Sequence, residues 1–351
     1  MTLDPRGDLV ALFRAIVDIE SVSGNERELA DQIEQVLRPC GHLSVLRDGD
    51  TVIARTDSGR AERIVIAGHL DTVPLAGNLP SWVEGDLVYG RGTCDMKGGV
   101  AVMLAAAVAL ETPSSDLTWI FYDHEEVESA ANSLTRIAAT RPELLAADFA
   151  VLMEPTSARV EGGCQGTLRF TVTTTGRAAH SARAWTGHNA IHDAVDVLAR
   201  LRDHQPEQPV VDGLRYHEGL NAVGIEGGIA GNVIPDRCTI SVNYRFAPHR
   251  SVEQAQDYCR QVLDGYQLSF TDAAAGARPG LDRPAAAAFL AAVGGEPSAK
   301  FGWTDVARFS ALGVPAVNFG PGNPEKAHAD DEFCPVGDLF ACRDAVLRWL
   351  G

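Results

Sequence analysis

The sequence has no apolar run that approaches the roughly 18 residues of a membrane span. The amino terminus, Met1-Thr2-Leu3-Asp4-Pro5, carries no basic stretch followed by a hydrophobic one, so we expect no secretory signal. The seven cysteines are an odd number, lie far apart, and form no C-x-x-C pair. This argues against a disulfide framework and against a thiolate zinc site. We therefore expect a cytoplasmic protein with reduced thiols.

Basic residues are also scarce. The chain has 30 Lys and Arg against 47 Asp and Glu, a formal net charge of −17 at pH 7. Nucleic-acid binding relies on basic patches that neutralise phosphates, so we expect neither a nucleic acid nor a membrane as partner. With 45% hydrophobic and 22% charged residues, the composition is typical of a globular enzyme, and 351 residues suffice for two domains.

Residue types that bind metals recur just after strand-like apolar runs. The runs 64–67, 117–122, 149–153 and 315–319 precede, in order, His69 and Asp71, Glu125 and Glu126, Glu154, and a loop with His328, while Asp95 stands in the glycine-rich segment 90–99. Open α/β sheets bind ligands at the carboxyl ends of their strands. Imidazoles and carboxylates gathered there predict a two-metal hydrolytic centre.

Two patterns of alternation divide the chain. In most of it, strand-like runs alternate with helical ones, which is typical of a largely parallel sheet covered by helices. Between residues 168 and 271 the order becomes β-α-β-β-α-β, the ferredoxin-like arrangement. The predicted fold class is α/β, with a mixed, mostly parallel sheet flanked by helices and an inserted ferredoxin-like α+β domain. We expect a discontinuous catalytic domain at 1–166 and 281–351, and an inserted domain at 167–280.

In order and approximate spacing, the motifs resemble the dinuclear zinc metallo-aminoacylase and carboxypeptidase family, M20. The matching segments are His69-x-Asp71, Gly90-Arg91-Gly92-x-x-Asp95-Met96-Lys97-Gly98-Gly99, Glu125-Glu126, Glu154-Pro155 and the late His328. The resemblance covers essentially the whole chain, including the insertion. It implies a zinc-peptidase-like catalytic domain, a dimerisation or lid role for the inserted domain, a homodimer, and two Zn²⁺ per subunit, for which Co²⁺ can substitute.

The resemblance also implies a role for each residue of the centre. The implied ligands are His69 and Glu154 for one zinc, Glu126 and His328 for the other, and Asp95 as the bridge between them. Asp71 would orient the imidazole of His69, and Glu125 would act as the general base. Because His124 interrupts the family's more common run of one Asp and two Glu, the roles of Glu125 and Glu126 could be exchanged. We interpret His124 as a solvent-exposed or core-satisfied histidine rather than a metal ligand, and Cys94 as a packing residue rather than a nucleophile.

Residues outside the metal motifs resemble the family's substrate contacts. His180, within the segment 176–183, resembles the histidine that reaches the active site of the neighbouring subunit, where it would donate to the tetrahedral oxyanion. The other implied substrate-binding residues are Arg183, Asn232, Arg245, Gly302, Thr304 and Arg308. Since guanidinium groups pair bidentately with carboxylates, the arginines favour a small anionic N-acyl amino acid as substrate.

The function implied by the resemblance is hydrolysis of N-succinyl-L,L-2,6-diaminopimelate to succinate and the diamine, in lysine and diaminopimelate biosynthesis. An acetylornithine deacetylase, another N-acyl-amino-acid hydrolase or a dipeptidase would use the same ligands. A metal-dead binding or scaffold protein is the alternative from another class, and the intact ligand set argues against it. A dinucleotide-binding enzyme is disfavoured because Gly90-Arg91-Gly92 is followed by Asp95 and Lys97 and not by a correctly spaced third glycine.

Overall fold

The computed structural model describes residues 3–351, which divide into two compact units. Of the described residues, unit 1 comprises 3–163, 279–298 and 304–351, and unit 2 comprises 164–278 and 299–303. The sequence pattern placed the divisions after 166 and before 281. It also left 299–303 in the catalytic part, because nothing in that short segment distinguishes it from its neighbours.

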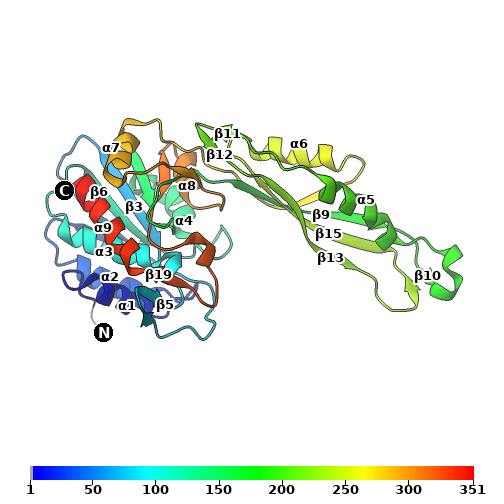
Figure 1. Cartoon of the computed structure of the whole chain (residues 1–351), viewed down its shortest axis with the longest axis horizontal. Helices are drawn as coiled ribbons and strands as arrows, with labels where there is room; N and C mark the ends of the chain where they lie inside the picture. Colours follow the sequence, from blue (N-terminus) through cyan, green and yellow to red (C-terminus); the bar gives the residue numbers. More distant parts are fainter. Residues whose placement is uncertain (1–2) are drawn as a thin grey trace. The chain divides into compact units, whose positions relative to one another are not determined.

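An eight-stranded mixed sheet forms the centre of unit 1, in the order β1-β2-β6-β3-β7-β18-β8-β17 (Figure 1). Four adjacent central strands, β6, β3, β7 and β18, run parallel, and β1, β2 and β8 pair antiparallel beside them. The bounds are Ser44–Asp48 (β1), Thr51–Arg55 (β2), Arg63–His69 (β3), Asp116–Tyr122 (β6), Phe149–Leu152 (β7), Glu161–Gly162 (β8), Ser298–Ala299 (β17) and Ala316–Asn318 (β18). The predicted α/β class is confirmed.

Helices cover this sheet because its central strands are apolar on both faces. The unit 1 helices are Leu9–Val17 (α1), Arg27–Leu37 (α2), Gly98–Ala109 (α3), Ser133–Thr140 (α4), Pro284–Val293 (α7), Val306–Ala311 (α8) and Val336–Leu350 (α9), with short turns at Pro142–Leu144 (η2) and Pro324–Lys326 (η4). Helix α3 is buried along almost its whole length and packs on α1, α9 and β3. Within residues 3–351, no helix is both long and apolar enough to cross a membrane.

The start of α3 fits tightly against the end of β7. A Cβ atom on Gly99 would overlap the carbonyl oxygen of Met153, so only glycine allows this approach. The segment that precedes α3 is thereby held at the carboxyl edge of the parallel strands.

A small sheet joins two segments that are far apart in the sequence. It consists of Trp82–Glu84 (β4), Leu87–Tyr89 (β5) and Phe333–Pro335 (β19), in the order β19-β5-β4. Tyr89 stacks on Trp82 with ring centroids 5.1 Å apart and lies 5.4 Å from the ring of Phe333. The segment that ends at Tyr89, directly before Gly90, therefore lies beside the segment that starts at Phe333, five residues after His328.

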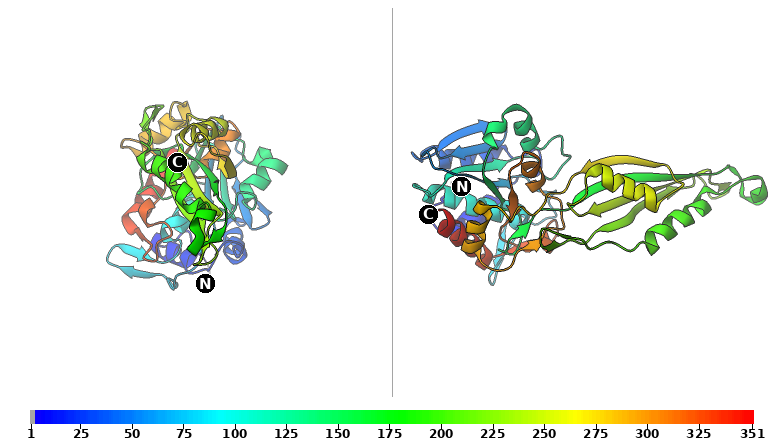
Figure 2. Two further views of the ribbon diagram at one scale, coloured as in Figure 1. Left: turned by 90° about the vertical axis from the view of Figure 1, so that its right-hand side faces the viewer. Right: turned by 90° about the horizontal axis from the view of Figure 1, so that it is seen from above.

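Unit 2 is a four-stranded antiparallel sheet with two helices on one face (Figures 1 and 2). Its main elements are Gly166–Thr175 (β9), Ala190–Asp203 (α5), Gly219–Gly227 (β13), Arg237–Phe246 (β15), Val252–Val262 (α6) and Leu268–Ala274 (β16). Smaller elements are Ala179–His180 (β10), Ser181–Thr186 (η3), Val210–Val211 (β11), Leu214–Arg215 (β12) and Val233–Ile234 (β14). The strand order β13-β15-β9-β16 is that of the predicted ferredoxin-like arrangement, and β13 forms one edge.

Candidate metal centre

The expected ligands meet at one edge of the unit 1 sheet. His69 is the last residue of β3, Glu126 follows β6, Glu154 follows β7, His328 lies in the loop after β18, and Asp95 lies in the π-helical turn η1 (Thr93–Lys97) that leads into α3. The strands β3, β6, β7 and β18 are parallel, so their carboxyl ends share this edge. Strand direction alone therefore brings together residues that are up to 259 positions apart in the sequence.

Asp95 lies between two imidazoles. Its Oδ1 is 3.1 Å from Nε2 of His69, and its Oδ2 is 3.4 Å from Nε2 of His328. His328 Nε2 also lies 2.9 Å from Oε1 of Glu126. In a tetrahedral zinc site with bonds of about 2.1 Å, neighbouring ligand atoms are roughly 3.4 Å apart. The donor atoms thus fit cation ligation, and one carboxylate oxygen of Asp95 faces each side of the centre.

Three of these ligands lie especially close together. Ligand atoms of His69, Asp95 and Glu126 all lie within 4.8 Å of one another. Hydrogen bonds to Asp95 and Glu126 raise the pKa of His328 to about 10. Burial opposes ionisation of Asp95, but its hydrogen bonds with His328 and His69 hold the pKa of this carboxyl below its usual range. The cluster is therefore a strong attractor for positive charge.

Glu125 and Glu126 have different surroundings. Glu126 belongs to the compact ligand group, whereas the carboxyl of Glu125 does not. Burial raises the pKa of Glu125 well above its usual value, and the carboxylates of Asp305, Glu154 and Glu126 raise it further, although His69 opposes them. A carboxyl with such a proton affinity suits general base and acid chemistry, and this geometry favours Glu126 as the ligand.

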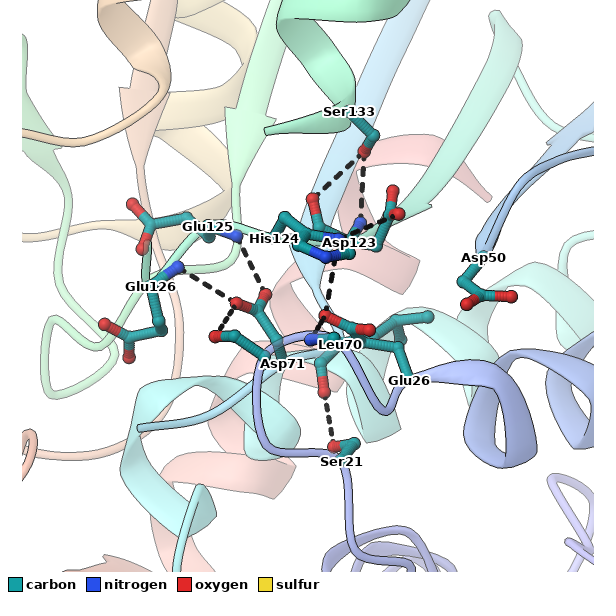
Figure 3. A network of polar contacts seen from close by, with 12 residues as sticks. Ser21, Glu26, Asp50, Leu70, Asp71, Asp123, His124, Glu125, Glu126 and Ser133 are labelled. Atoms are coloured by element: carbon teal, nitrogen blue, oxygen red, sulfur yellow. Dashed lines mark hydrogen bonds and ion pairs between the residues drawn. The ribbon is translucent and has the colours of Figure 1, made fainter. Parts of the chain in front are cut away.

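Asp71 binds the backbone of the loop that carries both glutamates. Its Oδ1 accepts a hydrogen bond of 2.9 Å from the amide of Glu125, and its Oδ2 accepts one of 2.9 Å from the amide of Glu126 (Figure 3). The hydroxyl of Ser23 donates a third, at 2.6 Å. Burial opposes ionisation of Asp71, but its hydrogen bonds, with those of His69 and Ser23 foremost, lower its pKa to about 2.

His69 contacts the main chain of Asp71 more closely than the expected carboxylate. Nδ1 of His69 is 2.9 Å from the backbone carbonyl oxygen of Asp71 and 3.5 Å from its Oδ1. The backbone carbonyl is thus the closer partner, since the carboxylate is engaged by the two glutamate amides. Asp71 orients the ring mainly through its main chain.

His124 and Cys94 stay outside the ligand cluster. Nδ1 of His124 is 3.1 Å from Oδ2 of Asp123 and 3.6 Å from Oε1 of Glu26, on the side of the loop away from Glu126 (Figure 3). The buried Sγ of Cys94 lies 3.0 Å from the carbonyl oxygen of Asn323. Both residues make contacts suited to packing and positioning.

Two residues expected to bind substrate are engaged by unit 1 itself. Thr304 is buried and donates to Oδ1 of Asn318 at 2.8 Å. Arg308 forms an ion pair with Asp305 and also donates to Thr135 and to Ser129. We therefore assign Arg308 a role in holding its own loop, in addition to any contact with substrate.

The remaining substrate-binding candidates belong to unit 2, where they form two groups. His180 is exposed at the start of η3, which also contains Arg183, and the amide of Ser181 donates to the carbonyl of Asn232 at 2.9 Å. Arg245 lies near the other end of β15. This strand spans roughly 30 Å at about 3.3–3.4 Å per residue, so the two groups are far apart. Gly302 is exposed in the short segment 299–303.

Glu332 and Ser23 contact the site, although no sequence motif marks either residue. Glu332 is 1% exposed and accepts hydrogen bonds from the amides of Cys94 and Asp95 at 2.9 and 3.0 Å. In the sequence it ends the run Asp330-Asp331-Glu332, which is typical of a solvated loop. The only available signal was its position four residues after His328.

Comparison with known proteins gives one matching family and several similar relatives. Residues 65–350 match the family described as Peptidase family M20/M25/M40. The chain is 47% identical over 348 residues to the succinyl-diaminopimelate desuccinylase of Corynebacterium glutamicum, with 96% of this chain and 94% of the relative covered. It is 52% identical over 352 residues to a Mycobacterium tuberculosis protein, DapE, to which the same activity is provisionally assigned, with 99% of each covered.

Solved structures show the same fold. A tripeptidase from Staphylococcus aureus superposes with a TM-score of 0.79 at 21% identity, covering 99% of this chain and 98% of that one. A dinuclear metal-binding M20 peptidase from Bacillus subtilis superposes with a TM-score of 0.72 at 18% identity, covering 97% of each chain.

Replacing Asp95 should remove bound metal, because its carboxylate lies between the two histidine ligands. Asp95→Ala should lose bound metal and activity together, because the carboxylate faces both imidazoles. Asp71→Ala should retain more metal, with losses of ~10–100-fold in affinity or activity, since its carboxylate acts through the glutamate loop. Elemental analysis of the purified variants measures this. Two metal ions per chain in Asp95→Ala would contradict the bridging role.

Proposed function

The chain belongs to peptidase family M20/M25/M40, and from that premise we propose that it hydrolyses N-succinyl-L,L-2,6-diaminopimelate to succinate and L,L-2,6-diaminopimelate. The observation that carries the chemistry is the carboxylate of Asp95 between His69 and His328, with the half-buried Glu125 nearby. The substrate follows from two relatives that cover nearly the whole chain and are named for this activity.

We assign two Zn²⁺ ions to the centre, with Co²⁺ as a substitute. One would be held by His69 and Glu154, the other by Glu126 and His328, and Asp95 would bridge them. When bound, the two ions supply Lewis acidity and lower the pKa of water towards ~7. The three carboxylates contribute −3 against +4, which leaves the centre a residual positive charge to attract an anionic substrate.

Glu125 is the proton carrier in this proposal. The attacking water gives a proton to its carboxylate, and the same carboxyl returns that proton to the leaving amine. Burial and three neighbouring acids stabilise the protonated form of Glu125, which favours holding the proton between the two steps. The hydrogen bond from its amide to Asp71 fixes its backbone during the transfer.

Substrate recognition requires a second copy of the chain. His180 and Asn232 lie at one end of β15 and Arg245 lies near the other, roughly 30 Å away, so one small substrate cannot contact both groups of a single unit 2. In a homodimer, one subunit can supply His180, Arg183 and Asn232, and the other Arg245. His180 would then donate to the oxyanion in its partner's site.

The surface of unit 2 supports this pairing. The edge strand β13 exposes Val223 by 65% and Ile225 by 52%, and the adjacent helix α5 exposes Val195 by 64%. An edge strand with exposed apolar side chains is a template for pairing with another strand. Joining two β13 edges around a two-fold axis would cover them.

We place the reaction in the cytoplasm, where the seven buried thiols would stay reduced. Acetylornithine deacetylase and dipeptidase activities remain the alternatives, because they need the same ligands and base. What distinguishes the proposed substrate is its additional carboxylates, which Arg183 and Arg245 would bind.

A substrate panel tests the proposed activity. The purified protein, loaded with zinc, should hydrolyse succinyl-diaminopimelate with a kcat/KM that exceeds the values for acetylornithine and for a dipeptide. The control is the same protein stripped of metal by a chelator. A higher kcat/KM for acetylornithine or the dipeptide would overturn the substrate assignment and leave the metal-dependent hydrolysis intact.

The two glutamates should differ when each is neutralised. Glu125→Gln should keep its metal and lose on the order of 10²–10⁴-fold in kcat, because the general base is lost. Glu126→Gln is the matched control and should lose metal affinity, since it removes a ligand. Metal content and kcat measured on both variants decide the assignment. If metal is lost with Glu125→Gln instead, the two roles are exchanged.

Subunit mixing tests the shared site. Inactive His180→Ala and inactive Glu125→Gln proteins, allowed to exchange subunits, should recover activity, because each heterodimer holds one site with both defects and one with neither. Random mixing makes half of the molecules heterodimers, so about one quarter of the wild-type activity should return. Native mass spectrometry verifies exchange. Exchange without recovery would place His180 in its own subunit's site or outside catalysis.

A further inference from the structure

The carboxylate of Glu332 is enclosed by the loop that carries Asp95. Its Oε1 accepts hydrogen bonds from the amides of Cys94 at 2.9 Å and Asp95 at 3.0 Å, and its Oε2 accepts one from the amide of Gly92 at 3.1 Å. The fourth donor is Nη1 of Arg91, at 3.0 Å. The side chain is 1% exposed, so protein donors replace the water that an ionised carboxylate would otherwise require.

The local backbone explains why these amides need an outside acceptor. Asp95 has φ −119° and ψ 99°, an extended conformation inside the turn η1. Such a residue leaves its amide without a helical partner, and amides at the start of a helix have no partner within the helix in any case. Glu332 fills this need for Asp95 and for Cys94 together.

Glu332 also belongs to the segment that carries the other imidazole. It lies four residues after His328 and directly before β19, and its own carbonyl accepts a hydrogen bond of 3.1 Å from the amide of Gly90. Arg91, which is 3% exposed, donates to the carbonyl of Ala329 at 3.1 Å, one residue beyond His328. The two loops are therefore joined by side-chain and backbone hydrogen bonds, all of them donated by the Asp95 loop and accepted by the His328 loop.

We propose that Glu332 is a positioning residue that holds the Asp95 loop and the His328 loop in one arrangement, so that the two metal positions form together. This rests on the proposed metal centre and adds a residue that touches neither metal nor substrate. A carboxylate that only capped the start of α3 would support the fold and leave metal affinity unchanged. The positioning role predicts that metal affinity depends on Glu332 in a protein that is still folded.

The deciding variant is Glu332→Gln. In the wild type, each oxygen of Glu332 accepts from two donors. The glutamine side chain has one oxygen and one NH₂ group, so it can accept from only two of the four donors, and its NH₂ group would face the other two N–H donors. We expect the dissociation constant for Co²⁺, followed by its visible absorption, to rise ~10–100-fold, the range for groups that orient ligands. Residual activity at saturating metal should fall as well, since both loops bear ligands.

Asp331→Asn is the matched control. It neutralises the neighbouring carboxylate of the same loop, which pairs with Lys326 at the surface at 2.6 Å. This control should bind Co²⁺ as the wild type does. Glu332→Asp keeps two acceptor oxygens on a shorter side chain, and its metal affinity should lie between those of the wild type and Glu332→Gln. It provides the same test if Glu332→Gln does not fold.

Thermal unfolding of each metal-free variant separates positioning from stability. Weakened Co²⁺ binding in variants that unfold cooperatively, with the control unchanged, supports the proposal. A lower unfolding temperature with wild-type affinity for two Co²⁺ would overturn it and leave Glu332 as a structural cap. If the wild type itself bound no metal, the proposed function would fail, which is a different result.

Discussion

The metal centre depends on buried carboxylates that bind backbone amides rather than metal. Asp71 accepts from the amides of Glu125 and Glu126, and Glu332 accepts from those of Cys94 and Asp95. Ligands that carry the same charge repel one another, so the loops that bear them would separate unless something else held them. A carboxylate that accepts several N–H bonds in a buried site gives strong, directional contacts of this kind. The centre is therefore supported by acids that its chemistry does not use.

The same electrostatics explains why the centre suits cations and proton transfer together. Burial raises the pKa of Glu125 well above its usual value. The neighbouring carboxylates of Asp305, Glu154 and Glu126 raise it further. In Asp95, by contrast, hydrogen bonds with His328 and His69 stabilise the ionised carboxylate. One loop of two adjacent glutamates thus provides a carboxylate in the ligand group and a carboxyl that retains protons.

The sequence could predict those features that follow from strand direction and residue order. His69 ends a parallel strand, and Glu126, Glu154 and His328 follow three others, so their convergence was predictable from apolar runs alone. The β-α-β-β-α-β order of unit 2 was predictable as well. Contacts that depend on tertiary approach were not predictable. The acidic run that ends at Glu332 resembles a solvated loop until β19 pairs with β5 and places it against Arg91. Arg308, expected at the substrate, also donates to Thr135 and Ser129, which lie more than 170 positions earlier in the sequence, and no local pattern indicates these contacts.

The length of one strand is the main argument for the proposed homodimer. β15 runs from Arg237 to Phe246, and the candidate substrate contacts of unit 2 lie near its opposite ends. Shortening the strand to bring them together would remove core residues such as Ile240 and Val242, which are buried between the sheet and its helices. In the proposed homodimer a second subunit would resolve this conflict, because a two-fold axis can set one end of a β15 beside the opposite end of its partner's β15. The exposed apolar edge at β13 would then be a requirement of catalysis as well as of assembly.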